Sequence, residues 1–139
     1  MTLNMITKVL LAAVIALSTA ACSVVSKNVR QEATPDLPFK ALQADVEVYE
    51  GKTVILGGYI LEVRNKPDQT HILVLQAPLS VRDQPLDRDA SEGRFIVHHE
   101  GFLDPAIYEK GREITVAGTV IGAQTGDIDE FAFTMPVID

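Results

Sequence analysis

The chain has 139 residues, of which 47% are hydrophobic, and its 12 basic and 19 acidic side chains give a formal net charge of −7. This length allows one domain with a hydrophobic core and no second domain. The acidic balance argues against nucleic acid or an anionic lipid face as the main partner. A single cysteine excludes an internal disulfide.

Residues 1–21 are typical of an export signal. Lys8 and the terminal amine provide a positive start, and an unbroken run of 13 apolar and small residues follows from Val9 to Ala21. A membrane-spanning helix needs about 20 such residues. The run therefore favours a cleaved signal peptide over a permanent transmembrane segment.

Cys22, directly after this run, resembles the modified cysteine of a bacterial lipobox. We expect cleavage between Ala21 and Cys22, a diacylglyceryl thioether on the nucleophilic sulfur, and acylation of the freed amine. Several acyl chains on one residue make a durable membrane anchor. Two alternatives remain: a chance cysteine behind an ordinary signal, or a buried core helix over residues 9–21. Ser23, rather than aspartate, resembles the outer-membrane sorting pattern.

The part that follows the signal divides into a linker and a domain. Lys8 is the only charged side chain before Cys22, so 11 basic and 19 acidic residues remain, a net charge of −8. Residues 22–38, with two prolines and no sustained period, predict a lipid-anchored, semi-extended linker. Residues 39–139 predict the folded domain, which begins with a short helix over 39–45 that covers one mouth of a barrel.

Alternating and β-branched residues predict five strands in this domain, over residues 53–63, 70–76, 93–99, 113–121 and 131–138. The glycine pair at 57–58 predicts a bend that lets the first strand serve two sheets. Residues 64–69 and 122–130 are expected to be turns, and 78–93 the longest loop. Asp104, as N-cap before Pro105, predicts a helical turn through residue 110.

Three strands, a short helix and two further strands indicate an all-β fold, a small five-stranded OB-like Greek-key barrel with one or two short helices. The 118 residues after the signal are too few for a comfortable eight-stranded, lipocalin-like barrel.

Several motifs resemble those of the Slp family of Gram-negative outer-membrane lipoproteins, the starvation-inducible kind. They include Phe102-Leu103-Asp104-Pro105, the strand openings at Gly51-Lys52 and Gly111-Arg112, and the closing Met135-Pro136-Val137-Ile138. The resemblance covers almost the whole chain. It implies a lipid-anchored protein of the outer membrane with a stress or stationary-phase role and no assigned catalytic activity. Family members tend to extend beyond the position of Asp139.

The three histidines, His71, His98 and His99, are candidate zinc ligands. Neighbours in a strand point to opposite faces, so His98 and His99 cannot both reach one ion without distortion. No second cysteine and no His-x-x-x-His pair is present. We therefore predict no metal site and no cofactor.

The remaining polar side chains that could carry chemistry are better explained by structural roles. Asp127, Asp129 and Glu130 lack the glycine and terminal glutamate of a calcium loop and predict a solvated turn. Helix capping accounts for Asp104. No serine or tyrosine has the neighbours of an activated nucleophile, and there is no phosphate-binding glycine loop. Phe95 and Arg94 alone are too few for the nucleic-acid face of an OB barrel.

The sequence thus favours a non-enzymatic envelope lipoprotein, with the outer membrane as its partner through the lipid anchor and a further envelope partner unknown. The alternative is a small-ligand-binding barrel, for a sugar or a cation, with loop 78–93 as a lid. A hydrolase is a remote third hypothesis, because it requires a pocket that clusters histidine with carboxylates.

Overall fold

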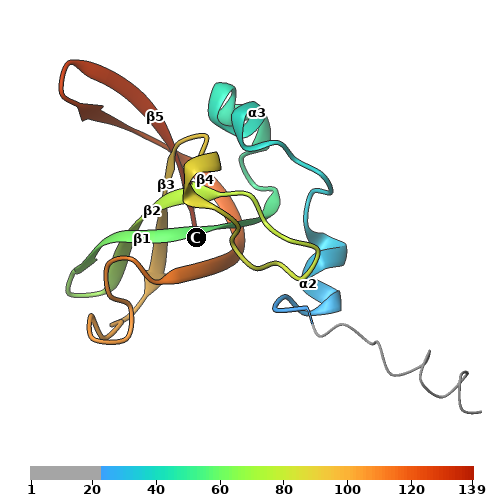
Figure 1. The fold of residues 1–139 in the computed structure, drawn as a ribbon, viewed down its shortest axis with the longest axis horizontal. Coiled ribbons are helices and arrows are strands. Elements are labelled where there is room, and N and C mark those ends of the chain that lie inside the picture. Colours follow the sequence, from blue (N-terminus) through green and yellow to red (C-terminus); the bar gives the residue numbers. More distant parts are fainter. Residues whose placement is uncertain (1–22) are drawn as a thin grey trace, which may run out of the picture.

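A computed structural model describes residues 23–139, so Ala21 and Cys22 lie outside the described residues. The described part is mostly β-structure with a few short helices (Figure 1). Its elements are α2 (Lys27–Glu32), α3 (Phe39–Ala44), α4 (Val46–Tyr49), β1 (Thr53–Asn65), β2 (Gln69–Ala77), the 3-10 helix η1 (Arg88–Ala90), β3 (Arg94–Glu100), β4 (Glu113–Ile128) and β5 (Phe131–Ile138).

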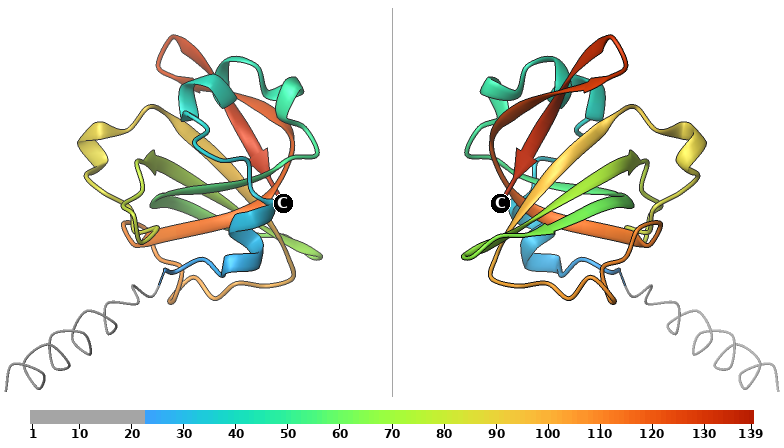
Figure 2. Two further views of the ribbon diagram at one scale, coloured as in Figure 1. Left: turned by 90° about the vertical axis from the view of Figure 1, so that its right-hand side faces the viewer. Right: turned by 90° about the vertical axis from the view of Figure 1, so that its left-hand side faces the viewer.

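The five strands form one sheet that closes on itself as a barrel, in the order β1-β2-β3-β5-β4 with β4 returning to β1 (Figure 2). All neighbours are antiparallel except β3 and β5, which pair in parallel at two positions, Ile96 with Val137 and Val97 with Ile138. The prediction of a five-stranded β-domain is confirmed. Among the described residues, no helix is long and apolar enough to cross a membrane.

Strand β1 belongs to both sides of the barrel, as the sequence predicts. Its first half, residues 53–59, pairs with β4, and its second half, residues 57–65, pairs with β2. The two pairings overlap at Gly57, Gly58 and Tyr59. A Cβ at Gly58 would lie 2.0 Å from the carbonyl oxygen of Leu75, so only glycine permits this backbone approach. The register shift itself lies further along β1, between residues 60 and 62.

The core fills the barrel, and helices α3 and α4 close it. Phe95, Ile60 and Ile138 are fully buried in the barrel interior. Leu42 of α3 is fully buried with them, and the ring centroids of Phe39 and Phe95 are 6.2 Å apart, within the range of favourable aromatic pairs. The helix predicted over residues 39–45 is therefore confirmed, and it packs on the same hydrophobic cluster as the barrel interior.

The helix predicted over residues 104–110 is wrong, because the chain makes only turns there. Asp104 caps as expected: its Oδ1 accepts from the amide of Ala106 at 2.9 Å, and its carbonyl oxygen accepts from Ile107 and Tyr108. The chain then reaches Gly111, at φ +92°, before a second turn can form. Capping starts one turn, and a nucleus this short does not propagate.

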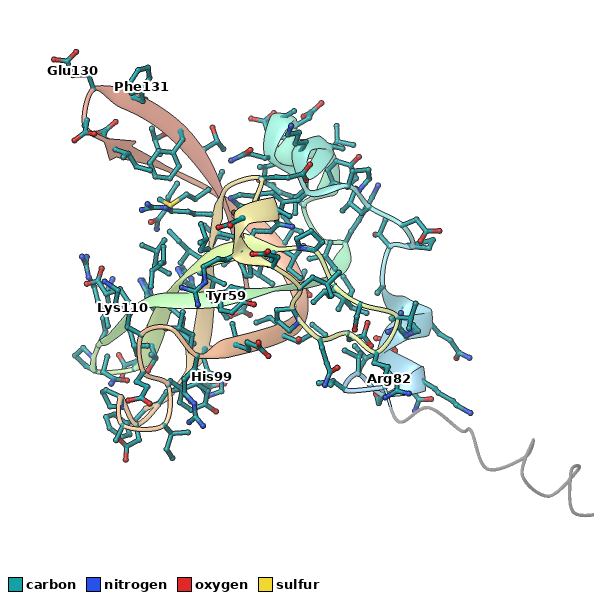
Figure 3. All side chains as sticks on the ribbon, viewed as in Figure 1. Tyr59, Arg82, His99, Lys110, Glu130 and Phe131 are labelled. Carbon is teal, nitrogen blue, oxygen red and sulfur yellow. The ribbon has the colours of Figure 1, made fainter. Side chains whose placement is uncertain are left out.

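The turn predicted over residues 122–130 is also wrong. Strand β4 continues to Ile128, and the β4–β5 hairpin turns only at Asp129 and Glu130, with Asp129 at φ +54°. Cross-strand pairs such as Gln124 with Met135 sustain the strand through a stretch whose glycines and acids are typical of loops. The outer half of this hairpin projects from the barrel, with Glu130 and Phe131 at its tip (Figure 3).

The linker expected over residues 22–38 differs from a semi-extended chain. Its described part contains helix α2, capped by Ser26, whose Oγ accepts from the amide of Val29 at 3.5 Å. After the helix, Ala33 forms an isolated bridge with Thr53, and the amide of Thr34 donates to the Thr53 carbonyl at 2.8 Å. This segment therefore lies against the barrel rather than apart from it.

Candidate functional site

The first described residues are fastened to the loop that follows β2. Ser23 Oγ donates to Asp83 Oδ2, and Arg30 Nη2 forms an ion pair with the same oxygen. The backbone amide of Val24 donates to the Arg82 carbonyl at 3.3 Å. Three contacts thus join the start of the described chain to positions more than 50 residues further along.

Asp83 is the centre of this attachment and is only 4% exposed. Burial alone would raise the pKa of its carboxyl group, but the hydrogen bonds from Arg30 and Ser23 and the charge of Arg30 hold that pKa below its ordinary value. Asp83 also has positive φ, and its carbonyl oxygen accepts from Thr115 Oγ1 of β4 at 2.6 Å. A charged, constrained residue therefore connects the N-terminal segment to the barrel wall.

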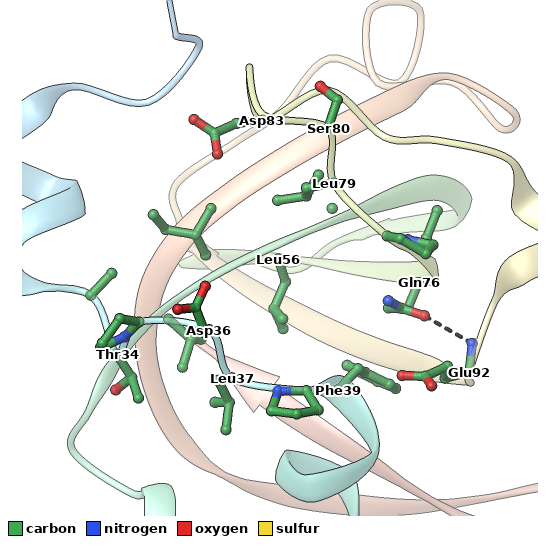
Figure 4. A pocket seen from close by; sticks show the side chains of 18 of the residues that line it. Thr34, Asp36, Leu37, Phe39, Leu56, Gln76, Leu79, Ser80, Asp83 and Glu92 are labelled. Atoms are coloured by element: carbon green, nitrogen blue, oxygen red, sulfur yellow. Dashed lines mark hydrogen bonds between the residues drawn. The ribbon is translucent and has the colours of Figure 1, made fainter.

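An open cleft of about 710 Å³ lies between this segment, β1 and the loop after β2 (Figure 4). Phe39, Leu56 and Leu79 line it with apolar surface, and Asp36 and Glu92 contribute carboxylates.

Gln76, like Asp83, is a buried polar residue in the lining of this cleft and is 6% exposed. Its Oε1 accepts from the Glu92 amide at 2.8 Å. The cleft lining contains no histidine among the described residues, so the remote hydrolase hypothesis finds no histidine–carboxylate grouping there.

The loop over residues 78–93, the lid of the ligand-binding hypothesis, contributes part of the wall of the cleft. Leu79 bridges to Pro85, and the Leu86 amide donates to the Pro78 carbonyl at 2.8 Å. Tyr59 Oη of β1 donates to the Leu86 carbonyl at 2.7 Å. These backbone contacts tie the loop to itself and to the barrel.

The histidines are arranged differently from the three-residue group considered as zinc ligands. His71 and His98 are register partners on β2 and β3, and their rings stack with centroids 4.0 Å apart and planes 11° apart. His99 pairs instead with Thr70 and is exposed. Among residues 23–139, no group of three His, Cys, Asp or Glu side chains could hold a metal ion.

The His71–His98 pair was missed by sequence reasoning, which compared only neighbours along one strand. Burial lowers the pKa of both side chains, the charge of His98 lowers that of His71 further, and Asp139 partly counteracts the effect at His98. Both Nε2 atoms are buried and have no hydrogen-bond partner. The antiparallel register of β2 and β3 places the two histidines opposite each other, and the 16-residue loop over 78–93 leaves that register unspecified in the sequence.

The remaining predicted positions keep their structural roles. Asp127, Asp129 and Glu130 are all exposed, but only Asp129 and Glu130 form the predicted solvated turn, whereas Asp127 belongs to strand β4. Phe95 is buried in the core, and the guanidinium of Arg94 lies over the ring of Phe133. Ala21 and Cys22, the predicted cleavage and acylation positions, lie outside the described residues.

Fold and attachment together describe a small β-barrel domain whose N-terminal segment is fixed to its surface. The family model described as the outer membrane lipoprotein Slp family matches residues 19–139. The chain therefore belongs to this family of outer-membrane lipoproteins of Gram-negative bacteria.

Three relatives are similar to the chain in sequence. The chain is 41% identical to an uncharacterized protein of Haemophilus influenzae over 88 residues, 63% of this chain and 48% of that protein. It is 29% identical to outer membrane protein Slp of Escherichia coli over 116 residues, 82% of this chain and 61% of the relative. It is 27% identical to the uncharacterized lipoprotein YeaY of Escherichia coli over 132 residues, 94% and 68% of the two chains. This chain thus spans about half to two thirds of its relatives' lengths. No solved structure matches it.

Proposed function

We propose that this chain is a non-enzymatic lipoprotein, cleaved after Ala21 and anchored in the outer membrane by acyl chains on Cys22. Its role is structural support of the envelope in stress or stationary phase, and its barrel is of the OB-like Greek-key kind. Family membership and the single cysteine behind an export-type run carry the proposal. The closed five-strand order supports the barrel type, with a turn in place of the helix between β3 and β4.

The anchor is tested by Cys22→Ser. Serine cannot form the thioether, so this variant is expected in the soluble fraction while the parent sediments with outer membranes. Phe131→Ser is the matched control, because it changes a side chain that is 79% exposed at the far hairpin tip. If Cys22→Ser sediments as fully as the parent and the control, the anchor is not at Cys22.

The cleft supports a second candidate, a site for a small sugar or a cation. The observation that favours it is the buried Gln76 amide in a cleft of small-ligand size whose lining also includes Asp36 and Glu92. A thermal-shift panel of envelope sugars and metal ions tests it, because a specific ligand raises the melting temperature by mass action. Gln76→Leu should abolish any positive shift, and the absence of a shift across the panel would remove this candidate.

A further inference from the structure

Two of the most exposed apolar side chains lie beside the start of the described chain. Val81 is 96% exposed and Val24 is 62% exposed. The hydrogen bond from the Val24 amide to the Arg82 carbonyl brings the two segments together. With Lys27 and Arg82, both exposed, these valines form what we call the anchor-side patch.

The proposed lipid anchor is close to this patch along the chain. Cys22 precedes Val24 by two residues, which span at most about 7 Å when fully extended. The segment after Val24 is fixed through Arg30 and Asp83. Acyl chains on Cys22 therefore enter the bilayer next to the patch, with no long tether to separate the barrel from the lipid surface.

The local charge near the anchor is opposite to that of the whole domain. Residues 23–30 and 80–83 contain Lys27, Arg30 and Arg82 against Asp83 alone, a net charge of +2, whereas the chain from Cys22 onward carries −8. Arg30 is paired with Asp83, and Lys27 and Arg82 take part in none of the ion pairs found within residues 23–139. Exposed valines next to unpaired basic side chains are typical of protein surfaces that bind at the headgroup region of a bilayer.

We propose that the anchor-side patch lies on the outer-membrane surface, with Val24 and Val81 between the lipid headgroups and Lys27 and Arg82 at their phosphates. This inference rests on the proposed anchor at Cys22. It gives the barrel one orientation, in which the cleft opens close to the bilayer and the β4–β5 hairpin points away from it. Arg82 and Phe131 lie at opposite ends of the molecule in Figure 3.

The orientation can be measured with single cysteines, because an acylated Cys22 has no thiol and any new cysteine is then unique. Val81→Cys and Phe131→Cys replace two strongly exposed side chains, 96% and 79% exposed, so both variants should fold. Each full-length lipidated protein is labelled with an NBD maleimide and placed in phosphatidylethanolamine and phosphatidylglycerol vesicles that carry doxyl-labelled lipid.

The proposal predicts a blue-shifted NBD emission at position 81 and quenching at least about twofold stronger than at position 131. Reversing the patch charges with Lys27→Glu and Arg82→Glu should reduce quenching at position 81. Lys110→Glu, an exposed lysine on the other side of the barrel, is the matched control and should leave it unchanged (Figure 3).

Equal quenching at positions 81 and 131 in vesicle-bound protein would overturn the orientation and leave the anchor intact. The parent protein, treated with the same maleimide, provides the test of the anchor. If it takes up no label and sediments with the vesicles, Cys22 is acylated and holds the protein on the lipid. A parent that takes up the maleimide at Cys22 and stays in the supernatant would instead overturn the proposed function, and the orientation with it.

Discussion

The two halves of β5 show how differently the chain is held in the barrel body and in the outer hairpin. Side chains from Met135 to Ile138 are buried, whereas Phe131 is 79% exposed. Both halves pair with the same strand, β4. Only the inner half has a second neighbour, since β3 joins β5 at Val137 and Ile138. The pairing with β4 alone is enough to form a strand, and the buried half of β5 is the half that reaches the barrel body, where β3 also joins it.

Removal of a core side chain should give the largest effect. Phe95→Ala empties a fully buried position and is expected to lower the free energy of unfolding by about 4 kcal/mol. Phe131→Ala, at the hairpin tip, should change it by less than about 0.5 kcal/mol. Urea unfolding of both variants measures this difference. Similar losses at the two positions would mean that the hairpin tip is packed against something in the folded protein.

Replacement of glycine by alanine should also lower stability more in the barrel body than in the outer hairpin, with a somewhat smaller effect than removal of a core side chain. In Gly58→Ala the new Cβ meets the Leu75 carbonyl of the neighbouring strand at 2.0 Å, so the strands must move apart at a cost of about 3 kcal/mol. In Gly126→Ala it meets only the flexible ends of Met135 and Phe133, which can turn aside. Gly126→Ala should therefore keep the melting temperature of the parent, and a loss matching that of Gly58→Ala would contradict this view of the hairpin.

The pH dependence of stability should arise in the barrel body, from His71 and His98. Burial holds the pKa of both His71 and His98 below the ordinary value of about 6.5. The folded state therefore binds fewer protons than the unfolded state, so this contribution to stability is complete above about pH 6.5 and is lost as the pH falls below it.

We expect the melting temperature to drop by about a few degrees between pH 7 and pH 5. His71→Gln should flatten the profile, and His99→Gln, at an exposed position, should leave it as in the parent. A parent profile that is flat over this range would show that the stacked pair does not resist protonation.

The attachment of the N-terminal segment should have the smallest and most local effect. Arg30→Gln removes the partner of buried Asp83 and should speed hydrogen exchange at the Thr34 amide without changing exchange in the hairpin. Arg64→Gln is the control, since its ion pair with Glu62, at 2.5 Å, is exposed. Unchanged exchange at Thr34 would show that the Arg30–Asp83 pair does not hold the segment.

The ion pair that attaches the N-terminal segment, Arg30 with Asp83, should also be lost in acid. The pKa of Asp83 is held below its ordinary value of about 4, so its ion pair persists at neutral pH and is lost as the pH falls through that lowered pKa. The protection of the Thr34 amide from exchange, followed from pH 7 down to pH 2, checks this: protection should persist below about pH 4, and its loss already above that pH would contradict the lowered pKa.

Local patterns carried most of the strand predictions. Strands β1, β2, β3 and β5 begin and end within two residues of their predicted positions, because runs of β-branched and aliphatic residues define them. Strand β4 was predicted to end at 121, since Gly122, Gly126 and Asp127 are typical of turns. Its last seven residues are held by pairing with β5, which local composition does not encode.

Other features could not be read from the sequence because they depend on distant contacts. The ion pair of Arg30 with Asp83 joins positions 53 residues apart and turns an expected linker into part of the folded surface. Val81 looks unremarkable in a polar loop, and only its closeness to Val24 defines the anchor-side patch. The His71–His98 stack depends on the register of β2 with β3, which the long loop between these strands does not specify.

The central claim is the covalent anchor, and intact-mass measurement of protein extracted from outer membranes tests it most directly. The account predicts a polypeptide that begins at Cys22 and carries the added mass of its acyl chains. A mature chain with an unmodified thiol, or one that retains residues 1–21, would contradict it.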